Sequence, residues 1–212
     1  MKIDRAGIPF MAAAMVPAAG LAVVRRYGWA TSLALLGGFF AYFFRDPDRT
    51  VPTGRDLVVS PADGTVMIAG PADMASAPPG SWMQVTIFLS PLDVHINRSP
   101  VAGRVTRIEY RPGRFLPAYD ARASENELNE IWVDAGGTPV VFRQVVGILA
   151  RRIVCRIAEG QHVGLGERIG LMKFGSRMDV FLPPHTELHV AVGQSVVAGE
   201  TILATLGSRD AA

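Results

Sequence analysis

The pair Gly175-Ser176 contains the residue types needed for a reaction of the backbone on itself. The glycine offers a sterically open carbonyl, and the serine offers a hydroxyl next to it. If a strained turn holds this part of the chain, the Ser176 hydroxyl can attack the carbonyl one residue upstream. Gly-Ser pairs are common, however, and a serine hydroxyl is a weak nucleophile until a base removes its proton. The pair therefore indicates chemistry only if the chain also supplies a base.

Two segments could supply that base. Asp63 lies in a tight-turn sequence, Ser-Pro-Ala-Asp-Gly, and His95 lies in a polar stretch between Pro91 and Pro100. Ser, His and Asp often act together, because imidazole accepts the hydroxyl proton while a carboxylate orients the imidazole. From spacing alone, an Asp-Gly turn, a surface histidine and a loop serine explain the same residues, and this plainer interpretation is favoured. The three residues are candidates that need further support.

A zinc site is a second chemistry that the sequence suggests. His185 and His189 are four residues apart, which would place them on one face of a helix. Pro183-Pro184 come just before them, however, and the surrounding pattern is strand-like, where residues at this spacing lie about 13 Å apart. We therefore expect two ordinary strand residues here, a turn residue at His162, and no metal.

The composition excludes other classes of protein. The chain has 212 residues, 49% of them hydrophobic, and its net charge of +2 is too small to indicate a nucleic-acid partner. The single cysteine, Cys155, excludes an internal disulfide and a Cys-rich metal site, and its apolar neighbours predict a buried structural thiol. Of the 21 basic residues only Lys2 and Lys173 are lysines, so amine–carbonyl chemistry has almost no protein amine to use.

The elements that would position these residues begin with an apolar hairpin. Residues 6–24 carry no charge over 19 positions and residues 27–44 none over 18, with only Arg25-Arg26 between them. About 20 apolar residues span a bilayer as a helix, and the aromatic run 39–44 is typical of a membrane interface. Residues 1–46 are therefore predicted to form a membrane-anchoring helical hairpin. A cleaved signal peptide and a buried hairpin in a soluble core are the alternatives.

The charges around this hairpin predict its orientation. The basic residues at the base of the hairpin outnumber the two arginines at its turn; they are Lys2, Arg5, Arg45, Arg49 and Arg55. Because cytoplasmic segments carry an excess of basic residues, this bias favours a catalytic domain on the cytoplasmic face of the cell (inner) membrane. A shallow re-entrant hairpin would have the same pattern, so both topologies stay open.

Residues 47–212 are typical of a mainly β domain. Short β-branched and apolar runs alternate with Gly, Pro, Asp and Asn turns, and the polar segment 121–130 is expected to be a loop or a short helix. The pattern Gly-Gln-x-Val-x-x-Gly-Glu-x-Ile at 160–169 recurs at 193–202. We predict a compact domain, similar to a β-sandwich or barrel, that contains two similar strand–turn–strand units.

Several stretches, in order along the chain, together resemble the phosphatidylserine decarboxylases, specifically their short bacterial and archaeal proenzyme form. None is specific alone, but together they are. The stretches are FFRDPDR (43–49), SPADG (60–64), FLSPLDVHINRSPVAGRV (88–105), ASENE (123–127), ILARRIV (148–154) and GLMKFGSRMDVFLP (170–183).

The resemblance implies an enzyme that processes itself. By this resemblance, Asp63 and His95 would activate Ser176, whose hydroxyl would attack the Gly175 carbonyl and convert the amide to an ester. Elimination then separates a β chain, residues 1–175, from an α chain that starts at position 176 with a pyruvoyl group made from the serine. The cofactor would be this pyruvoyl group, with no metal and no pyridoxal phosphate. The carbonyl is thus built from the backbone, which is compatible with the scarcity of lysine.

The resemblance also implies the reaction and the partners. The serine amine of phosphatidylserine would condense with the pyruvoyl ketone, and loss of CO2 would leave a carbanion that the conjugated carbonyl stabilises. His95 is then the nearest candidate for the proton donor, because imidazole suits proton transfer at neutral pH. Arg98 and Arg177 are proposed for the lipid phosphate by sequence proximity. The expected partners are the bilayer and its phosphatidylserine, and a homodimer is left open.

A biotinyl or lipoyl carrier domain is the main alternative. The repeat resembles the strand–turn pattern of such domains, and Leu171-Met172-Lys173 is similar to the surroundings of their modified lysine. This alternative predicts that Lys173 is exposed at the tip of a hairpin. It leaves the segments around Asp63 and His95 unexplained.

Overall fold

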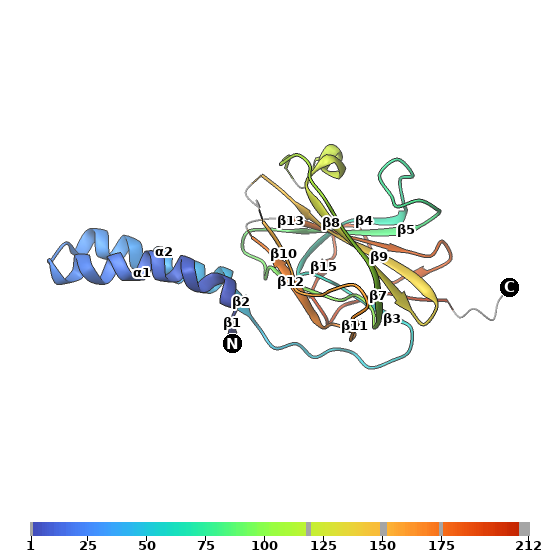
Figure 1. The fold of residues 1–212 in the computed structure, drawn as a ribbon, viewed down its shortest axis with the longest axis horizontal. Helices are drawn as coiled ribbons and strands as arrows, with labels where there is room; N and C mark the ends of the chain where they lie inside the picture. Colours follow the sequence, from blue (N-terminus) through green and yellow to red (C-terminus); the bar gives the residue numbers. More distant parts are fainter. Residues whose placement is uncertain (1, 118–119, 149–151, 174–175, 208–212) are drawn as a thin grey trace. The chain divides into compact units, whose positions relative to one another are not determined.

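The computed structural model of the chain describes residues 2–117, 120–148, 152–173 and 176–207 (Figure 1). The chain divides into two compact units, Met1–Asp48 and Arg49–Ala212. This division lies two residues after the boundary expected from the sequence. The first unit is helical and the second is built almost entirely of strands, as Figure 1 shows.

The first unit is a pair of antiparallel helices. The elements follow in the order β1 (Lys2–Ile3), the 3-10 helix η1 (Arg5–Gly7), α1 (Ile8–Val23), α2 (Tyr27–Phe43) and β2 (Arg45–Asp46), and the short strands β1 and β2 pair at the base of the hairpin. The chain reverses between the helices through Arg25, which has a positive φ of 60°. At the base, Phe10 stacks on Phe44 with ring centroids 5.4 Å apart.

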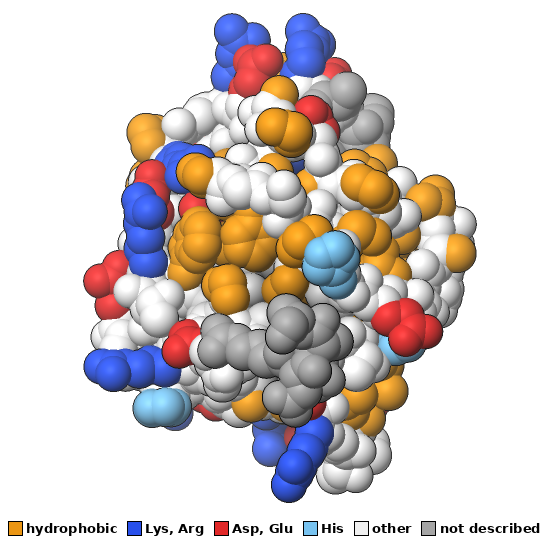
Figure 2. Space-filling view, turned by 90° about the vertical axis from the view of Figure 1, so that its right-hand side faces the viewer, with side chains coloured by type: hydrophobic (Ala, Val, Ile, Leu, Met, Phe, Trp, Pro, Cys, Tyr) orange, Lys and Arg blue, Asp and Glu red, His pale blue; other side chains and the backbone are white. Residues whose placement is uncertain are grey.

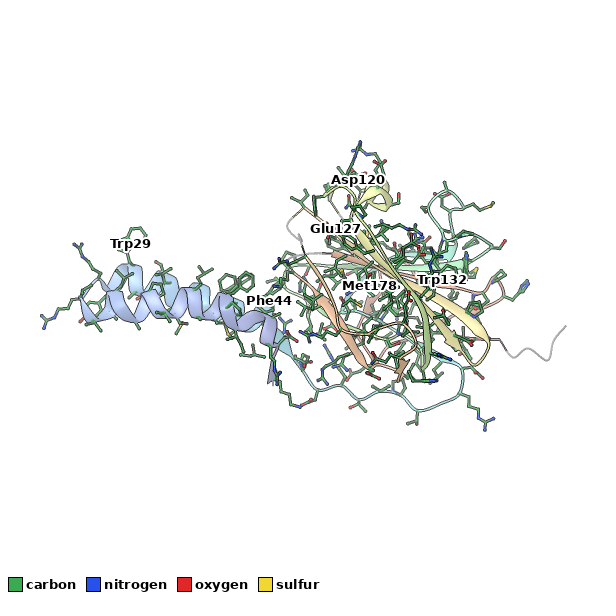
Figure 3. The ribbon with its side chains drawn as sticks, in the orientation of Figure 1. Trp29, Phe44, Asp120, Glu127, Trp132 and Met178 are labelled. Atoms are coloured by element: carbon green, nitrogen blue, oxygen red, sulfur yellow. The ribbon has the colours of Figure 1, made fainter. Side chains whose placement is uncertain are left out.

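Both helices expose apolar side chains. Val16, Trp29 and Leu35 are 70%, 71% and 71% exposed, and Figure 3 shows Trp29 near the turn and Phe44 at the base. Among the described residues one helical segment, Arg5–Val23, is long and apolar enough to cross a membrane, with 17% of its window buried. Helices that leave this much apolar surface open are compatible with membrane association.

The second unit consists of one large sheet and two small ones. The large sheet has the order β11-β7-β8-β9-β13-β5-β4-β15, the small sheets have the orders β10-β12-β6 and β14-β16-β3, and the paired strands are antiparallel. The strands are β3 (Leu57–Val59), β4 (Gly64–Pro71), β5 (Met83–Leu89), β6 (Ile96–Arg98), β7 (Gly103–Arg111), β8 (Leu128–Ala135), β9 (Thr138–Val146), β10 (Ile153–Cys155), β11 (His162–Val163), β12 (Arg168–Met172), β13 (Ser176–Leu182), β14 (Glu187–Leu188), β15 (Ser195–Val196) and β16 (Ile202–Thr205). A 3-10 helix, η2 (Ala121–Glu125), lies in the segment expected to be a loop or short helix. The prediction of a mainly β domain after a helical hairpin is confirmed.

The hydrophobic core lies between the large sheet and the small ones. Alternate residues of the central strands point into it, such as Ile87 of β5, Phe142 of β9 and Met178 of β13, all fully buried. Ile169 of β12 and Leu203 of β16 meet them from the small sheets. On one face of the β domain the apolar side chains gather near the centre, and most of the charged ones lie toward the edge (Figure 2).

The two repeats form equivalent turns, as the sequence predicts. Gly160 and Gly193 have φ angles of 82° and 88°, so glycine supplies the left-handed conformation in both. The Gly160 amide donates to the Val105 carbonyl at 2.7 Å, and the Gly193 amide donates to the Val66 carbonyl at 2.8 Å. The two units therefore contact matching positions on two other strands.

Candidate active site

Ser176 begins the central strand of the large sheet. Its backbone pairs with Leu89 of β5 on one side and with Val146 of β9 on the other. The preceding strand β12, which ends at Met172, belongs to a different sheet, so the chain crosses between two sheets over 173–175. Gly175 and the side chain of Ser176 lie outside the described residues. The described residues on the two sides of the expected cleavage bond thus belong to strands of different sheets.

His95 is buried beside this crossing. It comes directly before β6 and is 2% exposed. Its carbonyl accepts a hydrogen bond of 3.3 Å from the amide of Met172, three residues before Gly175. Its ring Nδ1 lies 2.9 Å from the carbonyl oxygen of Asp93. When Nδ1–H donates to that carbonyl, Nε2 is the basic nitrogen.

A turn closed by Asp93 positions this histidine. The Ser90 amide donates to the Asp93 carboxylate at 2.7 Å, and the Asp93 amide donates back to the Ser90 carbonyl at 3.0 Å. Asp93 thus holds the backbone three residues earlier and closes the turn from both sides. We did not single out Asp93 from the sequence. The signal was present in the Ser-Pro-Leu-Asp segment, whose residue types are typical of such turns.

Asp63 is held by groups from distant parts of the chain. Its Oδ2 accepts a hydrogen bond of 2.7 Å from the Arg49 guanidinium, and its Oδ1 accepts one of 2.8 Å from the Ala198 amide. The next residue, Gly64, has a φ of 152°, and a Cβ there would lie 2.1 Å from the Phe88 carbonyl oxygen, so only glycine fits. Within the described residues, the structure brings Asp63 into hydrogen-bond contact with Arg49 and Ala198, not with His95.

The two arginines expected to bind phosphate both have protein partners. Arg98 is 5% exposed, and its Nη1 donates to the Gly166 carbonyl at 2.9 Å. Arg177 is 8% exposed and forms an ion pair with the Asp179 carboxylate at 2.9 and 3.0 Å. Their roles toward a lipid phosphate remain a prediction from the sequence.

Two further sequence expectations are wrong. Lys173 is half-buried in the crossing from β12 to β13, which belong to different sheets, so it is not exposed at a hairpin tip and the carrier-domain alternative is not supported. His162 lies in β11 rather than in a turn, because its strand pairs with β7.

The remaining candidates also have ordinary surroundings. Cys155 is half-buried rather than buried, with its Sγ 3.7 Å from the Ile157 carbonyl. His185 lies in a turn and His189 directly follows β14, so the expectation that both are strand residues is wrong. Both are exposed, and the His189 Nε2 lies 2.8 Å from the Thr205 hydroxyl. Throughout the described part of the chain, no three His, Cys, Asp or Glu side chains come together as metal ligands would.

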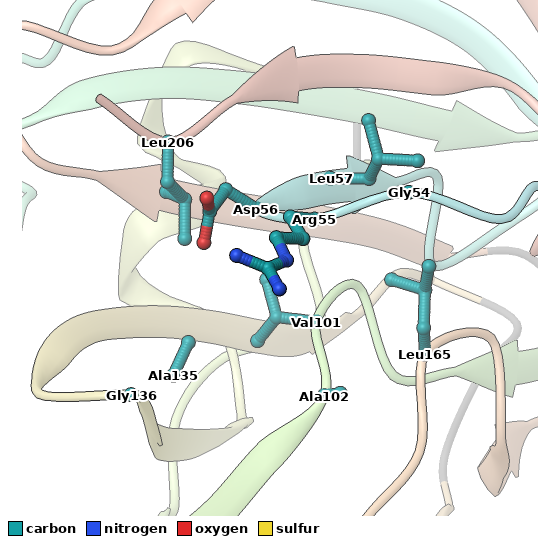
Figure 4. A pocket seen from close by; sticks show the side chains of 10 residues that line it. All are labelled: Gly54, Arg55, Asp56, Leu57, Val101, Ala102, Ala135, Gly136, Leu165 and Leu206. Atoms are coloured by element: carbon teal, nitrogen blue, oxygen red, sulfur yellow. The ribbon is translucent and has the colours of Figure 1, made fainter. Parts of the chain in front are cut away.

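A separate cavity of about 260 Å³ opens elsewhere in the β domain (Figure 4). Arg55 and Asp56 contribute its charged groups, and the Arg55 side chain extends across it in Figure 4. None of the candidate catalytic or phosphate-binding residues lines this cavity. The lining residues are Gly54, Arg55, Asp56, Leu57, Val101, Ala102, Ala135, Gly136, Leu165 and Leu206.

Ser176 thus begins a central strand, and the buried His95 is hydrogen-bonded through its backbone to the end of the preceding strand, β12. The family model for phosphatidylserine decarboxylase matches residues 36–204, and the chain belongs to that family. The resemblance noted in the sequence is thereby confirmed.

Individual relatives agree with the family model. A protein of Pelodictyon phaeoclathratiforme is 49% identical over 175 residues, covering 82% of this chain and 81% of its own. A protein of Solibacter usitatus is 45% identical over 205 residues, covering 96% and 97%. One of Paramagnetospirillum magneticum is 44% identical over 219 residues, covering 99% and 89%. All three are named phosphatidylserine decarboxylase proenzyme.

Proposed function

We propose that this chain cleaves itself between Gly175 and Ser176 and then decarboxylates phosphatidylserine to phosphatidylethanolamine and CO2. The observation that carries the proposal is the family match over residues 36–204, which includes the Gly-Ser bond and the segment of His95. Denaturing electrophoresis of the purified protein, together with an assay of lipid product, tests it. Two chains and phosphatidylethanolamine support the proposal, and one intact chain without product contradicts it.

In this proposal the processing step takes place between His95, Ser176 and the Gly175 carbonyl. His95 accepts the proton of the Ser176 hydroxyl, whose oxygen bonds to the Gly175 carbonyl carbon while the amide C–N bond breaks. The nitrogen of residue 176 takes up that proton as the ester forms. Loss of the α-hydrogen of residue 176 then breaks its Cβ–O bond, so that the Gly175 carboxylate leaves and a dehydroalanine remains. Water adds to the imine tautomer of this residue and replaces the nitrogen, which releases ammonia and leaves a ketone. His95 suits the role because it is buried, and because the Asp93 carbonyl holds its ring.

The strand pairing of Ser176 fits a pyruvoyl group at this position. Once formed, the group would stay attached through the backbone of β13, which β5 and β9 hold on both sides. Such a group supplies a carbonyl that withdraws electrons from the substrate carbon. His95 can return a proton to that carbon from within the same buried site.

Asp63 has a supporting place in this proposal. We expect Asp63→Asn to weaken the contact with Arg49, because the amide is neutral, while Oδ1 can still accept from Ala198. A hydrogen bond between charged groups contributes about 1.5–3 kcal/mol to stability, and this pair is 12% and 16% exposed. Thermal unfolding of the uncleaved protein should therefore show a lower stability for Asp63→Asn than for the unsubstituted sequence. If cleavage slows 1000-fold with no loss of stability, Asp63 instead acts directly on the reacting groups.

Membrane association follows from the exposed apolar faces of the helical unit. In the double variant Val16→Lys and Leu35→Lys, each charge should cost about 2.5–3.5 kcal/mol when the helices insert into a bilayer. Both side chains are exposed in the structure, so the lysines should not disturb the folding of the chain. The variant should move from the membrane to the soluble fraction after carbonate extraction. Val192 is an exposed apolar residue of the β domain, and the control variant Val192→Lys should remain in the membrane fraction as the wild type does. Unchanged membrane retention of the double variant would contradict the anchor.

We propose that the membrane is the cell membrane, with the β domain on its cytoplasmic face. The support is the excess of basic residues at the base of the hairpin over the two at its turn. The lipid substrate is consistent with such a location, since the enzyme must reach a headgroup at the interface.

A further inference from the structure

Three amide side chains form a chain of hydrogen bonds inside the β domain. Asn129 Nδ2 of β8 donates to Gln144 Oε1 of β9 at 3.1 Å, and Gln144 Nε2 donates to Asn97 Oδ1 of β6 at 2.9 Å. Asn129 is 4% exposed, and the other two are fully buried. The chain links the large sheet to a small one across the interior.

This series of hydrogen-bonded amides ends in a donor without a partner. Asn97 Nδ2 is a buried nitrogen that has no hydrogen-bond acceptor among the residues that the structure describes. A buried donor left without an acceptor costs about 1–3 kcal/mol, so such groups are rare in folded proteins and call for a reason. The direction of the two preceding hydrogen bonds makes the end of the chain an N–H donor.

The position of this donor ties it to the candidate site. Asn97 lies in β6 and follows His95 by two residues, and His95 comes directly before that strand. Its partner Gln144 pairs with Met178, which comes two residues after Ser176 in β13 and is fully buried (Figure 3). The orphan donor therefore belongs to a side chain that is two residues from His95 in sequence and that contacts, through Gln144, a neighbour of the strand begun by Ser176.

We propose that Asn97 Nδ2 donates a hydrogen bond to a carbonyl oxygen that gains negative charge at the 175–176 junction. The inference rests on the proposed function, which generates such an oxygen twice. The first is the Gly175 carbonyl oxygen while the serine attacks it. The second is a carbonyl oxygen at residue 176 while CO2 leaves the substrate. A donor that meets its acceptor only during the reaction explains why it is unpaired in the resting chain.

Two variants of Asn97 test the proposal. Asn97→Leu removes the donor at every pH, and losing one such donor slows a reaction by about 100- to 1000-fold. We expect this decrease either in the rate of self-cleavage, measured by electrophoresis, or in the kcat of the cleaved enzyme. Slower self-cleavage would identify the Gly175 carbonyl oxygen as the acceptor, and a lower kcat would identify the carbonyl oxygen at residue 176. Asn97→Asp keeps an acceptor for Gln144 but offers an O–H donor only when protonated. Its rate relative to the wild type should therefore recover as the pH falls.

The control is another buried amide of the large sheet. Gln84 of β5 is 4% exposed, and its Nε2 donates to the Thr86 hydroxyl at 2.8 Å. Gln84→Leu should lower the thermal stability without changing either rate, since its donor already has a partner. The same rates in Asn97→Leu as in the wild type, or an Asn97→Asp rate ratio that is independent of pH, would overturn the inference.

The cleavage and the activity of the wild-type chain distinguish a failure of this inference from a failure of the proposed function. If the wild-type chain neither cleaves nor decarboxylates, the proposed function fails. If it does both and the Asn97 variants match it, only the role of Asn97 fails.

Discussion

The variant Ser176→Ala should remain a single chain of 22.7 kDa and produce no phosphatidylethanolamine. Alanine has no hydroxyl to attack the Gly175 carbonyl, so neither the cleavage nor the ketone can form. The fold should persist, because Ser176 joins β5 and β9 through its backbone. Mass spectrometry of the intact protein would detect the wild-type chains of residues 1–175 and 176–212, and only the full-length species in the variant.

Ser195→Ala is a matched control for that variant. Ser195 also begins a strand, β15, and pairs through its backbone with Thr65. Its replacement should leave cleavage and decarboxylation unchanged. A Ser176→Ala protein that still separates into two chains would place the nucleophile elsewhere and end the proposed mechanism.

The second large effect is expected for His95→Asn. The asparagine amide can still donate to the Asp93 carbonyl, but it cannot accept the serine proton at neutral pH. Loss of a general base slows a reaction by about 100- to 10,000-fold. The half-life of the precursor, measured during pulse-labelled synthesis, should lengthen accordingly.

His185→Asn controls for the loss of a histidine as such. His185 is exposed, and we expect its variant to cleave at the wild-type rate. Wild-type cleavage in His95→Asn would show that another group accepts the proton. A variant that folds, cleaves slowly and then decarboxylates normally would limit His95 to the processing step.

The sequence predicted local features better than long-range ones. The short β-branched runs and the Gly-Gln repeats led to the mainly β domain and its paired turns, because strand and turn preferences act over a few residues. Charge-free runs likewise predicted the helical hairpin. His162 was an exception, since a two-residue strand in a repeat turn depends on pairing with β7 and not on local preference.

The contacts of the candidate site could not be read in the same way. Asp63 binds an amide 135 residues later in the chain, and no local pattern encodes that partner. Asn97 and Gln144 resemble surface residues of strands, because polar side chains in short strands usually face water. Only the packing of two sheets shows that they are buried, and that one donor is left over.

The central place of β13 has a consequence for the cleaved protein. Cleavage before Ser176 leaves β13 as the first strand of a separate 37-residue polypeptide that supplies core residues Met178 and Val180 and lies between β5 and β9 of the larger one. If the proposed cleavage occurs, the mature molecule would be an obligate heterodimer whose interface is its own hydrophobic core. Its unfolding would become a dissociation, so its melting temperature should rise with protein concentration, whereas that of the single-chain precursor should not.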